Sequence, residues 1–248
     1  MDLSSKASKP FFFKQFVIHQ DKCAMKVGTD SLLLGAWAEG NDGRSFPERI
    51  LDIGTGTGVL AMMMAQRYPL AKIDAVEVDE NSYFQALENV NNSKFRHHIR
   101  LYHVAFQDFR SDSQISLQYD LIISNPPYFV NAYKSGVPAR DIARHNDSLT
   151  FKELIENVLR LLKPQGTLHL ILPVQEGTFF MKLAEASGLY CYKKCEVVMR
   201  RSKPPKHWLL AFSRVKQAIS ESTLVIQDAH EVYTPEYQLM AKDFLKIF

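Results

Sequence analysis

A loop with three alternating glycines stands out in the sequence, Asp52-Ile53-Gly54-Thr55-Gly56-Thr57-Gly58. Glycine lets a chain turn sharply and lets a ligand approach the backbone without meeting a Cβ atom. The G-x-G-x-G spacing differs from the G-x-G-x-x-G of dinucleotide-binding loops. A carboxylate two places before the first glycine repels a pyrophosphate and attracts an amine. Asp52 with Gly54, Gly56 and Gly58 therefore favours S-adenosylmethionine over NAD as the ligand.

Acidic residues also follow the next two predicted strands. Glu77 stands where the second strand ends, and a carboxylate there can accept hydrogen bonds from both ribose hydroxyls of a nucleoside. Asp79 competes for that role, and Asp108, after the third strand, can accept a hydrogen bond from an adenine amino group. The alternative is structural: Glu77 and Asp79 cap the helix that begins at residue 80, and Asp108 is a turn residue.

A second chemical motif is Ser124-Asn125-Pro126-Pro127-Tyr128, which follows the fourth predicted strand. Proline is disfavoured inside a sheet, so the strand must end here, at the edge where open α/β sheets bind ligands. An exocyclic amine on a flat base needs acceptors for its two protons and a ring for stacking. The Asn125 side-chain oxygen and the Pro126 carbonyl would be the acceptors, in a turn stiffened by Pro127, and Tyr128 the stacking surface. The alternative is a rigid surface turn whose Asn is satisfied internally.

The elements that position these motifs alternate regularly between strand and helix from residue 49 onward. Strands are predicted over 49–53, 71–78, 99–105, 119–124, 167–172, 190–199 and 207–213. Helices are predicted over 31–38 (capped by Thr29 or Asp30), 58–68, 80–92, 150–163 (opened by a capping box), 175–187 and 236–248. In the helix over 80–92, Phe84, Leu87 and Val90 are expected on the buried face. This order predicts an α/β fold with a doubly wound, mostly parallel seven-stranded sheet and an antiparallel edge.

Composition and length favour one domain over residues 1–248. We expect a flexible leader over 1–10, an N-terminal cover over 11–48, a catalytic core over 49–214 and a C-terminal addition over 215–248. The hydrophobic fraction of 46% is ordinary for a globular chain, and no run of eighteen apolar residues predicts a membrane span. The three cysteines have no zinc-ligand spacing, so we expect no metal site and a cytoplasmic protein with reduced thiols.

The net charge of +3 is small, but the charge is unevenly distributed. Between Tyr190 and Lys216 the sequence contains eight Lys or Arg residues and a single acidic residue, Glu196. Such a segment can neutralise nucleic-acid phosphates, with Trp208 and Tyr192 available for stacking. The candidate RNA-binding residues are Arg200, Arg201, Lys203 and Lys206, together with Arg140 and Arg144 after the proline-rich turn. The alternatives are a solvated hairpin and exposed loop charges.

At this point the chain resembles the class I S-adenosylmethionine-dependent methyltransferases, within the amino-methylating group that carries Asn-Pro-Pro-Tyr. The stretch Ala24-Met25-Lys26-Val27-Gly28-Thr29-Asp30-Ser31-Leu32-Leu33-Leu34-Gly35-Ala36-Trp37 resembles the N-terminal signature of the bacterial valine-tRNA adenine-N6 methyltransferases. That family modifies the adenosine just 3′ of the anticodon. The resemblance extends from about Phe13 to Arg214 and includes the segments 140–145 and 204–208.

The resemblance implies a Rossmann-like methyltransferase fold, S-adenosylmethionine as cofactor and tRNA as substrate, with no membrane and no stable protein partner. It implies that Lys26, Gly28, Thr29 and Asp30 lie beside the methionine end of the cofactor. It further implies that Asp52 and the glycines surround that ligand, that Glu77 binds its ribose and that Asp108 lies near its adenine. Asn125 to Tyr128 would hold the target base.

Three other functions fit parts of the pattern. In protein glutamine N5-methylation the target is an amide nitrogen, which is planar like the exocyclic amine of a base. Such enzymes, however, are expected to carry a helical N-terminal substrate domain. DNA adenine methylation usually needs a separate recognition domain, which 248 residues hardly accommodate. A non-catalytic RNA-binding module with a degenerate methyltransferase fold is the third, and the intact glycine and Asn-Pro-Pro-Tyr motifs argue against it.

Overall fold

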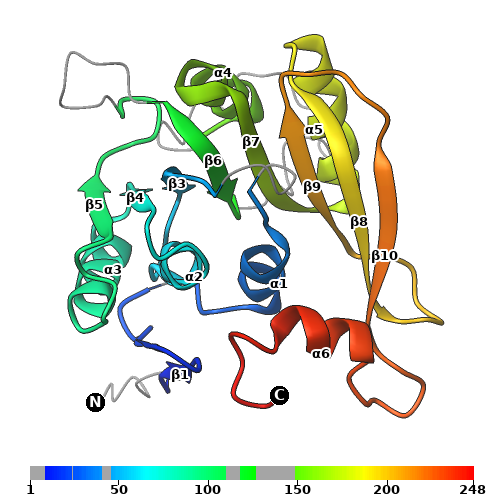
Figure 1. The fold of residues 1–248 in the computed structure, drawn as a ribbon, viewed down its shortest axis with the longest axis horizontal. Coiled ribbons are helices and arrows are strands. Elements are labelled where there is room, and N and C mark those ends of the chain that lie inside the picture. Colours follow the sequence, from blue (N-terminus) through cyan, green and yellow to red (C-terminus); the bar gives the residue numbers. More distant parts are fainter. Residues whose placement is uncertain (1–8, 24, 41–45, 110–117, 127–148) are drawn as a thin grey trace, which may run out of the picture.

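A computed structural model describes residues 9–23, 25–40, 46–109, 118–126 and 149–248. Its central feature is an eight-stranded sheet in the order β10-β8-β9-β7-β6-β3-β4-β5 (Figure 1). The strands are β3 (Arg49–Ile53), β4 (Lys72–Glu77), β5 (Ile99–His103), β6 (Tyr119–Ser124), β7 (Leu162–Pro173), β8 (Tyr190–Arg200), β9 (His207–Ser213) and β10 (Ser220–Gln227). All neighbouring pairs are parallel except the two that β9 makes with β7 and β8.

The doubly wound α/β prediction, with an antiparallel pair at one side of the sheet, is therefore confirmed. The predicted strand number of seven is wrong, because β10 adds an eighth strand beside β8 from the C-terminal addition. The first four residues of β10 are exposed and only Leu224 and Ile226 are buried. The strand signal in the sequence is confined to the short run 223–226, after three polar residues, and is easily missed.

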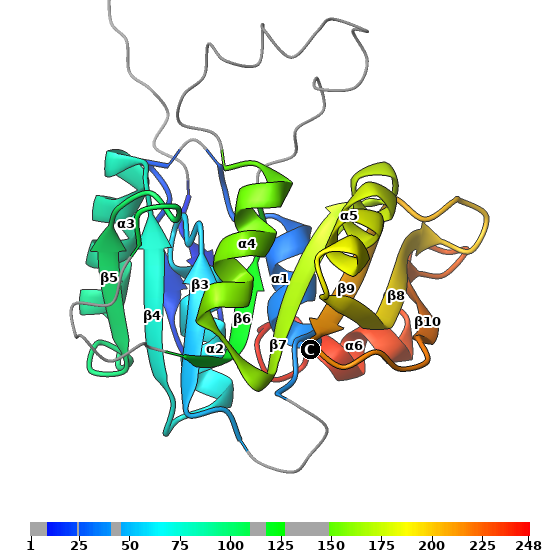
Figure 2. The ribbon, with the colours of Figure 1, turned by 90° about the horizontal axis from the view of Figure 1, so that it is seen from above.

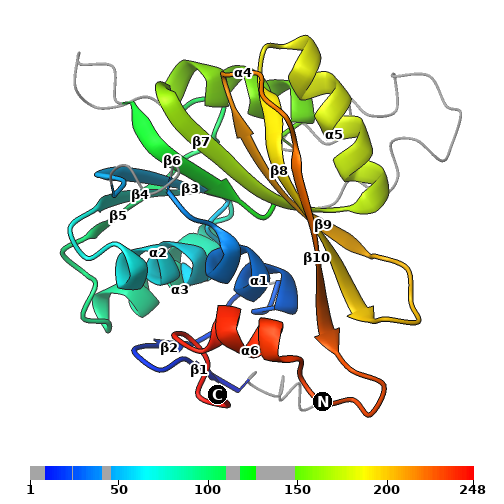
Figure 3. The same cartoon turned by 45° about the vertical axis from the view of Figure 1, so that its right-hand side comes forward.

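Helices cover both faces of the sheet (Figure 2, Figure 3). On one face lie α4 (Phe151–Leu161) and α5 (Val174–Ala186), and on the other α1 (Thr29–Trp37), α2 (Val59–Arg67), α3 (Glu80–Asn91) and α6 (Pro235–Ala241). Each face has its own hydrophobic core cluster. The capping box predicted for α4 is present, with Thr150 and Glu153 bonded reciprocally. No described helix is long and apolar enough to cross a membrane.

Two helix details differ from the sequence prediction. Helix α1 is capped by Gly28, and neither Thr29 nor Asp30 makes a side-chain cap. Helix α6 ends at Ala241 and does not continue to residue 248 as predicted. The cap of α1 matters for the site, because it places Asp30 and Ser31 in the first turn of the helix, beside the sheet.

Of the three residues predicted on the buried face of α3, Val90 is buried and Leu87 is half-buried, but Phe84 is not buried. Phe84 is 49% exposed, whereas Gln85, Ala86, Asn89 and Val90 are the buried residues. Asn89 accepts a hydrogen bond from the His19 amide and donates to the carbonyls of His19 and Thr57. Apolar periodicity misses Gln85 and Asn89 because they are polar, and the hydrogen bonds of Asn89 join the N-terminal cover to the glycine loop.

The N-terminal cover begins with a two-stranded hairpin, β1 (Phe11–Phe12) and β2 (Val17–Ile18). Residues near the end of the chain close over it: the Lys14 amide donates to the Phe244 carbonyl at 2.8 Å, and Phe13 forms a bridge with Leu245. Phe13 and Ile18 are almost completely buried. Both side chains belong to the same buried hydrophobic cluster as Ile50 of β3.

Candidate cofactor and substrate site

The glycine loop connects β3 to α2 and takes the backbone shape that its glycines allow. Gly54, Gly56 and Gly58 all have positive φ, at 68°, 57° and 83°. A Cβ atom added at Gly54 or Gly56 would meet no atom of the described residues within 4 Å, so these residues leave open space against the loop there. At Gly58 it would meet Ala86 of α3. The first two glycines thus border a space that a ligand can enter, and the third permits helix packing.

Asp52 is completely buried beneath this loop. Its Oδ2 accepts hydrogen bonds from the Thr55 hydroxyl at 2.6 Å and the Ala61 amide at 3.0 Å, so this oxygen holds the loop to the first turn of α2. Its Oδ1 is buried and has no partner among the described residues. Burial raises the pKa of the Asp52 carboxyl to about 7. Oδ2 therefore stabilises the loop, whereas Oδ1 bonds none of the described residues.

Glu77, at the end of β4, meets the glycine loop from the neighbouring strand. Its Oε2 accepts a hydrogen bond from the Gly56 amide at 2.8 Å, and its Oε1 accepts from Val78 and Asp79, both at 2.9 Å. Asp79 has a different role, since it caps α3 by accepting a hydrogen bond from the Ser82 amide. Of the two acids proposed for the ribose, only Glu77 contacts the glycine loop.

The remaining predicted cofactor residues have separate places in the fold. Asp108 is exposed in the turn after β5, and its amide donates to the Ala105 carbonyl. The Lys26 ammonium donates to the carbonyls of Gln20 and Cys23, so it stabilises the turn of the chain before α1. Thr29 and Gly28 form the start of α1.

Asn125 lies at the carboxyl end of β6 and contacts the first turn of α1. Its Nδ2 donates a hydrogen bond to the Ser31 hydroxyl at 3.1 Å. The residue before it, Ser124, donates to the Ile53 carbonyl at 2.8 Å and so ties the end of β6 to the end of β3. Beside Ser31, Asp30 lies 3.5 Å from the Nδ1 of His207, the first residue of β9. The structure thus brings the N-terminal signature, the glycine loop strand and Asn125 to one edge of the sheet.

Ion pairs in the folded structure neutralise part of the positive charge of the basic segment between Tyr190 and Lys216. Acidic residues remote in the chain pair with four of its members: Lys193 with Glu39, Lys194 with Glu221, Arg200 with Glu231 and Lys216 with Glu185. The side chains of Arg201, Lys203 and Lys206 are exposed, and no described carboxylate pairs with them. The unpaired charge is therefore concentrated in the hairpin that joins β8 to β9.

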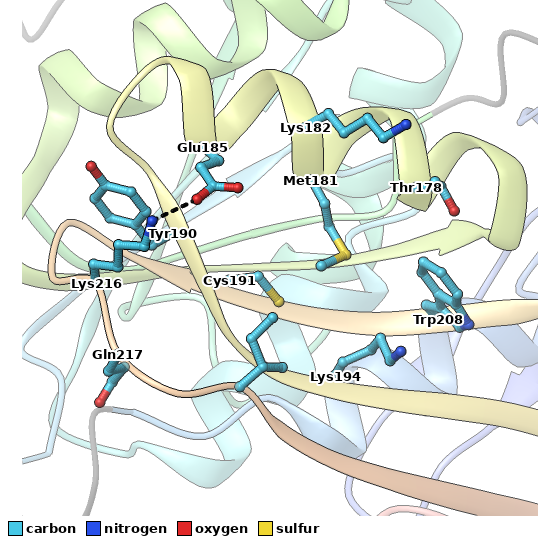
Figure 4. Close-up of a pocket in the computed structure, with 11 residues that line it drawn as sticks. Thr178, Met181, Lys182, Glu185, Tyr190, Cys191, Lys194, Trp208, Lys216 and Gln217 are labelled. Carbon is cyan, nitrogen blue, oxygen red and sulfur yellow. Dashed lines mark hydrogen bonds and ion pairs between the residues drawn. The ribbon is translucent and has the colours of Figure 1, made fainter.

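A cavity of about 300 Å³ opens beside this segment, between α5 and the strands β8 and β9 (Figure 4). Its lining includes Lys194, Lys216 and Trp208, all members of the basic segment. Lys194 and Lys216 are ion-paired, so they leave little net charge for an anion. The cavity is lined by none of the glycine-loop residues or Asn125, and we assign it no ligand.

Four predicted site residues lie outside the described residues: Pro127, Tyr128, Arg140 and Arg144. Pro126, the last described residue of the turn, is buried.

Comparison with known proteins gives consistent results. Residues 31–188 match the family model Methyltransferase small domain. The chain is 44% identical over 236 residues to a Trichodesmium erythraeum protein named tRNA1(Val) (adenine(37)-N6)-methyltransferase, covering 94% of this chain and 96% of that one. A solved structure of a predicted O-methyltransferase from Agrobacterium tumefaciens has a TM-score of 0.66 at 17% identity, covering 86% of this chain and 96% of that chain. The structure of P. horikoshii TYW2 in complex with MeSAdo has a TM-score of 0.57 at 17% identity, covering 84% and 71%. The two structural matches concern the fold alone.

Proposed function

Because this chain belongs to the tRNA1(Val) (adenine(37)-N6)-methyltransferase family, we propose that it methylates N6 of adenosine 37 in tRNA1(Val). The observation that carries this proposal is the 44% identity over nearly the whole of both chains. S-adenosylmethionine is the methyl donor of the reaction.

The residues around the glycine loop fit that cofactor. No described residue bonds the buried Asp52 Oδ1, which is costly unless a donor such as the cofactor amine completes it. The open space against Gly54 and Gly56 leaves room for a ligand close to the backbone. Glu77 uses three of the about four lone-pair sites of its carboxylate on backbone amides, so its Oε2 keeps one site that can accept from a ribose hydroxyl. When bound, the cofactor supplies an electrophilic methyl group on a sulfonium.

Asn125 and Pro126 would bind the amine that receives the methyl group. The lone pair of adenine N6 is conjugated into the ring, so this nitrogen is a poor nucleophile. Hydrogen bonds from its protons to the Asn125 Oδ1 and the Pro126 carbonyl make it more electron-rich and align it for in-line attack. As the nitrogen becomes cationic, these fixed acceptors stabilise the transition state more than the ground state. The methylated ammonium is acidic enough to lose its proton to water.

Substrate capture would use residues on both sides of this turn. Tyr128 would stack on the base after it leaves its loop, where unstacking costs less than in a duplex. Arg201, Lys203 and Lys206 would neutralise phosphates of the tRNA, with Arg140 and Arg144 as further candidates. A tRNA substrate also implies that the protein acts in the cytoplasm.

Protein glutamine methylation is not favoured. In the described part of the N-terminal cover, residues 9–23 and 25–40 form a small hairpin and α1, which packs into the core. That arrangement differs from the helical substrate domain expected of such an enzyme.

The experiment uses total tRNA that lacks N6-methyladenosine. The protein and labelled S-adenosylmethionine are incubated with it, and the product nucleoside is mapped by mass spectrometry. We expect N6-methyladenosine at position 37 of tRNA1(Val), and Asn125→Ala should lower kcat by about 100-fold or more while S-adenosylmethionine still binds. Methylation at another atom would overturn the proposed function, and near-normal turnover by Asn125→Ala would overturn the role of Asn125.

A further inference from the structure

Asn89 is a polar residue on the buried face of α3 that has no part in the reaction proposed above. Its side chain is 1% exposed and bonds three backbone groups. Oδ1 accepts from the His19 amide at 2.9 Å, and Nδ2 donates to the carbonyls of His19 and Thr57 at 2.8 Å and 2.9 Å. A backbone N–H only donates and a carbonyl only accepts, so these partners require one orientation of the amide.

The two segments that Asn89 joins belong to two sides of the proposed cofactor site. Thr57 lies within the glycine loop, between two of its glycines. His19 begins the pre-α1 segment, residues 19–23 and 25–28, which includes the start of the N-terminal signature. Within this segment the Val27 amide donates to the Gln20 side chain at 2.8 Å. A shift of the chain at His19 is therefore passed on toward the start of α1.

Helix α3 supports both sides, and two of its buried polar residues divide the task. Asn89 bonds the pre-α1 segment and the glycine loop together. One turn earlier, Gln85 is also fully buried and accepts from the Lys22 amide at 2.9 Å, so it bonds the pre-α1 segment alone. The two residues thus offer a comparison between holding one side of the site and linking both sides.

We propose that Asn89 is a positioning residue for the cofactor site, which sets the separation between the glycine loop and the pre-α1 segment. This inference rests on the proposed function, because it takes the space beside the glycine loop as the cofactor site. Asn89 acts through the two backbone segments that it bonds. Without it the two sides can shift relative to each other, and cofactor binding must then restore their order at a cost in affinity.

The matched variants Asn89→Leu and Gln85→Met test this. Each keeps roughly the size of the side chain and removes its hydrogen bonds to the pre-α1 segment, and only Asn89→Leu also removes the bond to Thr57. We expect Asn89→Leu to weaken S-adenosylmethionine binding about ten-fold, and Gln85→Met to change it less than about two-fold. Titration calorimetry is run at a temperature where thermal unfolding shows both variants to be folded, so a loss of stability alone leaves the affinity unchanged. Equal affinities in the two variants would overturn the proposal.

Hydrogen exchange of the wild-type protein gives a second measurement, which does not depend on whether a variant folds. S-adenosylmethionine should slow exchange of the His19 amide at least about ten-fold, because this amide exchanges when its bond to Asn89 opens. The Phe13 amide, bonded to the Phe16 carbonyl in the hairpin of the same cover, is the control and should slow less. An equal effect on both amides would overturn the coupling. A wild-type protein that binds S-adenosylmethionine but forms no N6-methyladenosine in tRNA would overturn the proposed function alone, because both measurements on Asn89 follow cofactor binding.

Discussion

The Gly56 amide donates a hydrogen bond of 2.8 Å to the carboxylate of Glu77, so the acid at the end of β4 holds the loop at the end of β3. One side chain thereby fixes the loop and presents the remaining lone pair of its Oε2 at the same place. This relationship predicts that loop geometry and ribose binding depend on the same residue.

We therefore expect Glu77→Ala to weaken S-adenosylmethionine binding by at least about ten-fold, because the loop loses an anchor and the ribose loses its acceptor. Asp79→Ala is the control. It should cost about 1 kcal/mol of stability through loss of the α3 cap and leave cofactor affinity unchanged. Titration calorimetry and thermal unfolding measure the two effects. A larger decrease of affinity in Asp79→Ala would assign the ribose to Asp79.

The glycine loop offers a test with an internal control elsewhere in the chain. Gly56 and Gly188 both have positive φ, and at neither would an added Cβ meet an atom of the described residues within 4 Å. Gly56→Ala and Gly188→Ala should each cost about 1 kcal/mol in unfolding free energy, because alanine is strained in this conformation. Only Gly56→Ala should also weaken S-adenosylmethionine binding, since its methyl group enters the space beside the loop. Equal cofactor affinity in both variants would show that this space is not the binding site.

Asp52 predicts a pH dependence of stability. Its pKa is about 7 in the folded protein and 3.8 in its ordinary state, so between those values the folded chain holds a proton that the unfolded chain has released. The stability contributed by the neutral acid is complete below about pH 4 and disappears as the pH rises through about 7. Asp52→Asn keeps an oxygen for Thr55 and Ala61 and does not titrate. Thermal unfolding of the cofactor-free variant should therefore change less between about pH 5 and 8 than that of the wild type.

The same carboxyl should respond to the cofactor. An amine placed against Oδ1 favours the charged carboxylate, so S-adenosylmethionine binding at a pH just below the pKa of about 7 should release a proton from Asp52. Calorimetric titrations in buffers of different ionisation enthalpy measure this release. It should disappear in Asp52→Asn, and its persistence there would place the proton on another group.

The ion pairs within the basic segment predict which cations bind RNA. Replacing Arg201, Lys203 and Lys206 with alanine should raise the KM for tRNA and lower its salt dependence, by about 0.7 in the log–log slope for each phosphate that these side chains neutralise. The control replaces three paired cations, Lys194, Arg200 and Lys216, and should change the slope much less. S-adenosylmethionine affinity should be unchanged in both triple variants. If the control changes the slope more, RNA displaces the acidic partners.

The alternation of strands and helices is predictable because the strands are buried on both faces and read as continuous apolar runs. The sequence predicts a strand over 119–124, and β6 has the same bounds. The placement of Asp52, Glu77 and Asn125 at one edge follows from the same reasoning, since parallel strands end on the same side of a sheet. Strand β10 is not predictable in this way, because it adds at the edge with half of its residues exposed.

The partners of individual side chains are beyond prediction, because they come from remote segments. The sequence shows eight cations against one acid between Tyr190 and Lys216, yet Glu39, Glu185, Glu221 and Glu231 neutralise half of them only after folding. The hydrogen bond from Asn125 to Ser31 is of the same kind, since it joins two motifs that are separate in the sequence.

The contact between the N-terminal hairpin and the residues after α6 has a consequence for the kinetics of folding. The Lys14 ammonium bonds the Lys242 carbonyl, a contact between residues 228 apart in the sequence, and the adjacent Phe13–Leu245 bridge spans a similar distance. Forming such a contact early would cost the entropy of a very long loop, with few other interactions to compensate. Neighbouring β-α-β units of the sheet, whose contacts are closer in sequence, should therefore assemble first. We expect refolding to end in a slow step in which the hairpin docks with the residues that follow α6, after the central strands are already protected from hydrogen exchange.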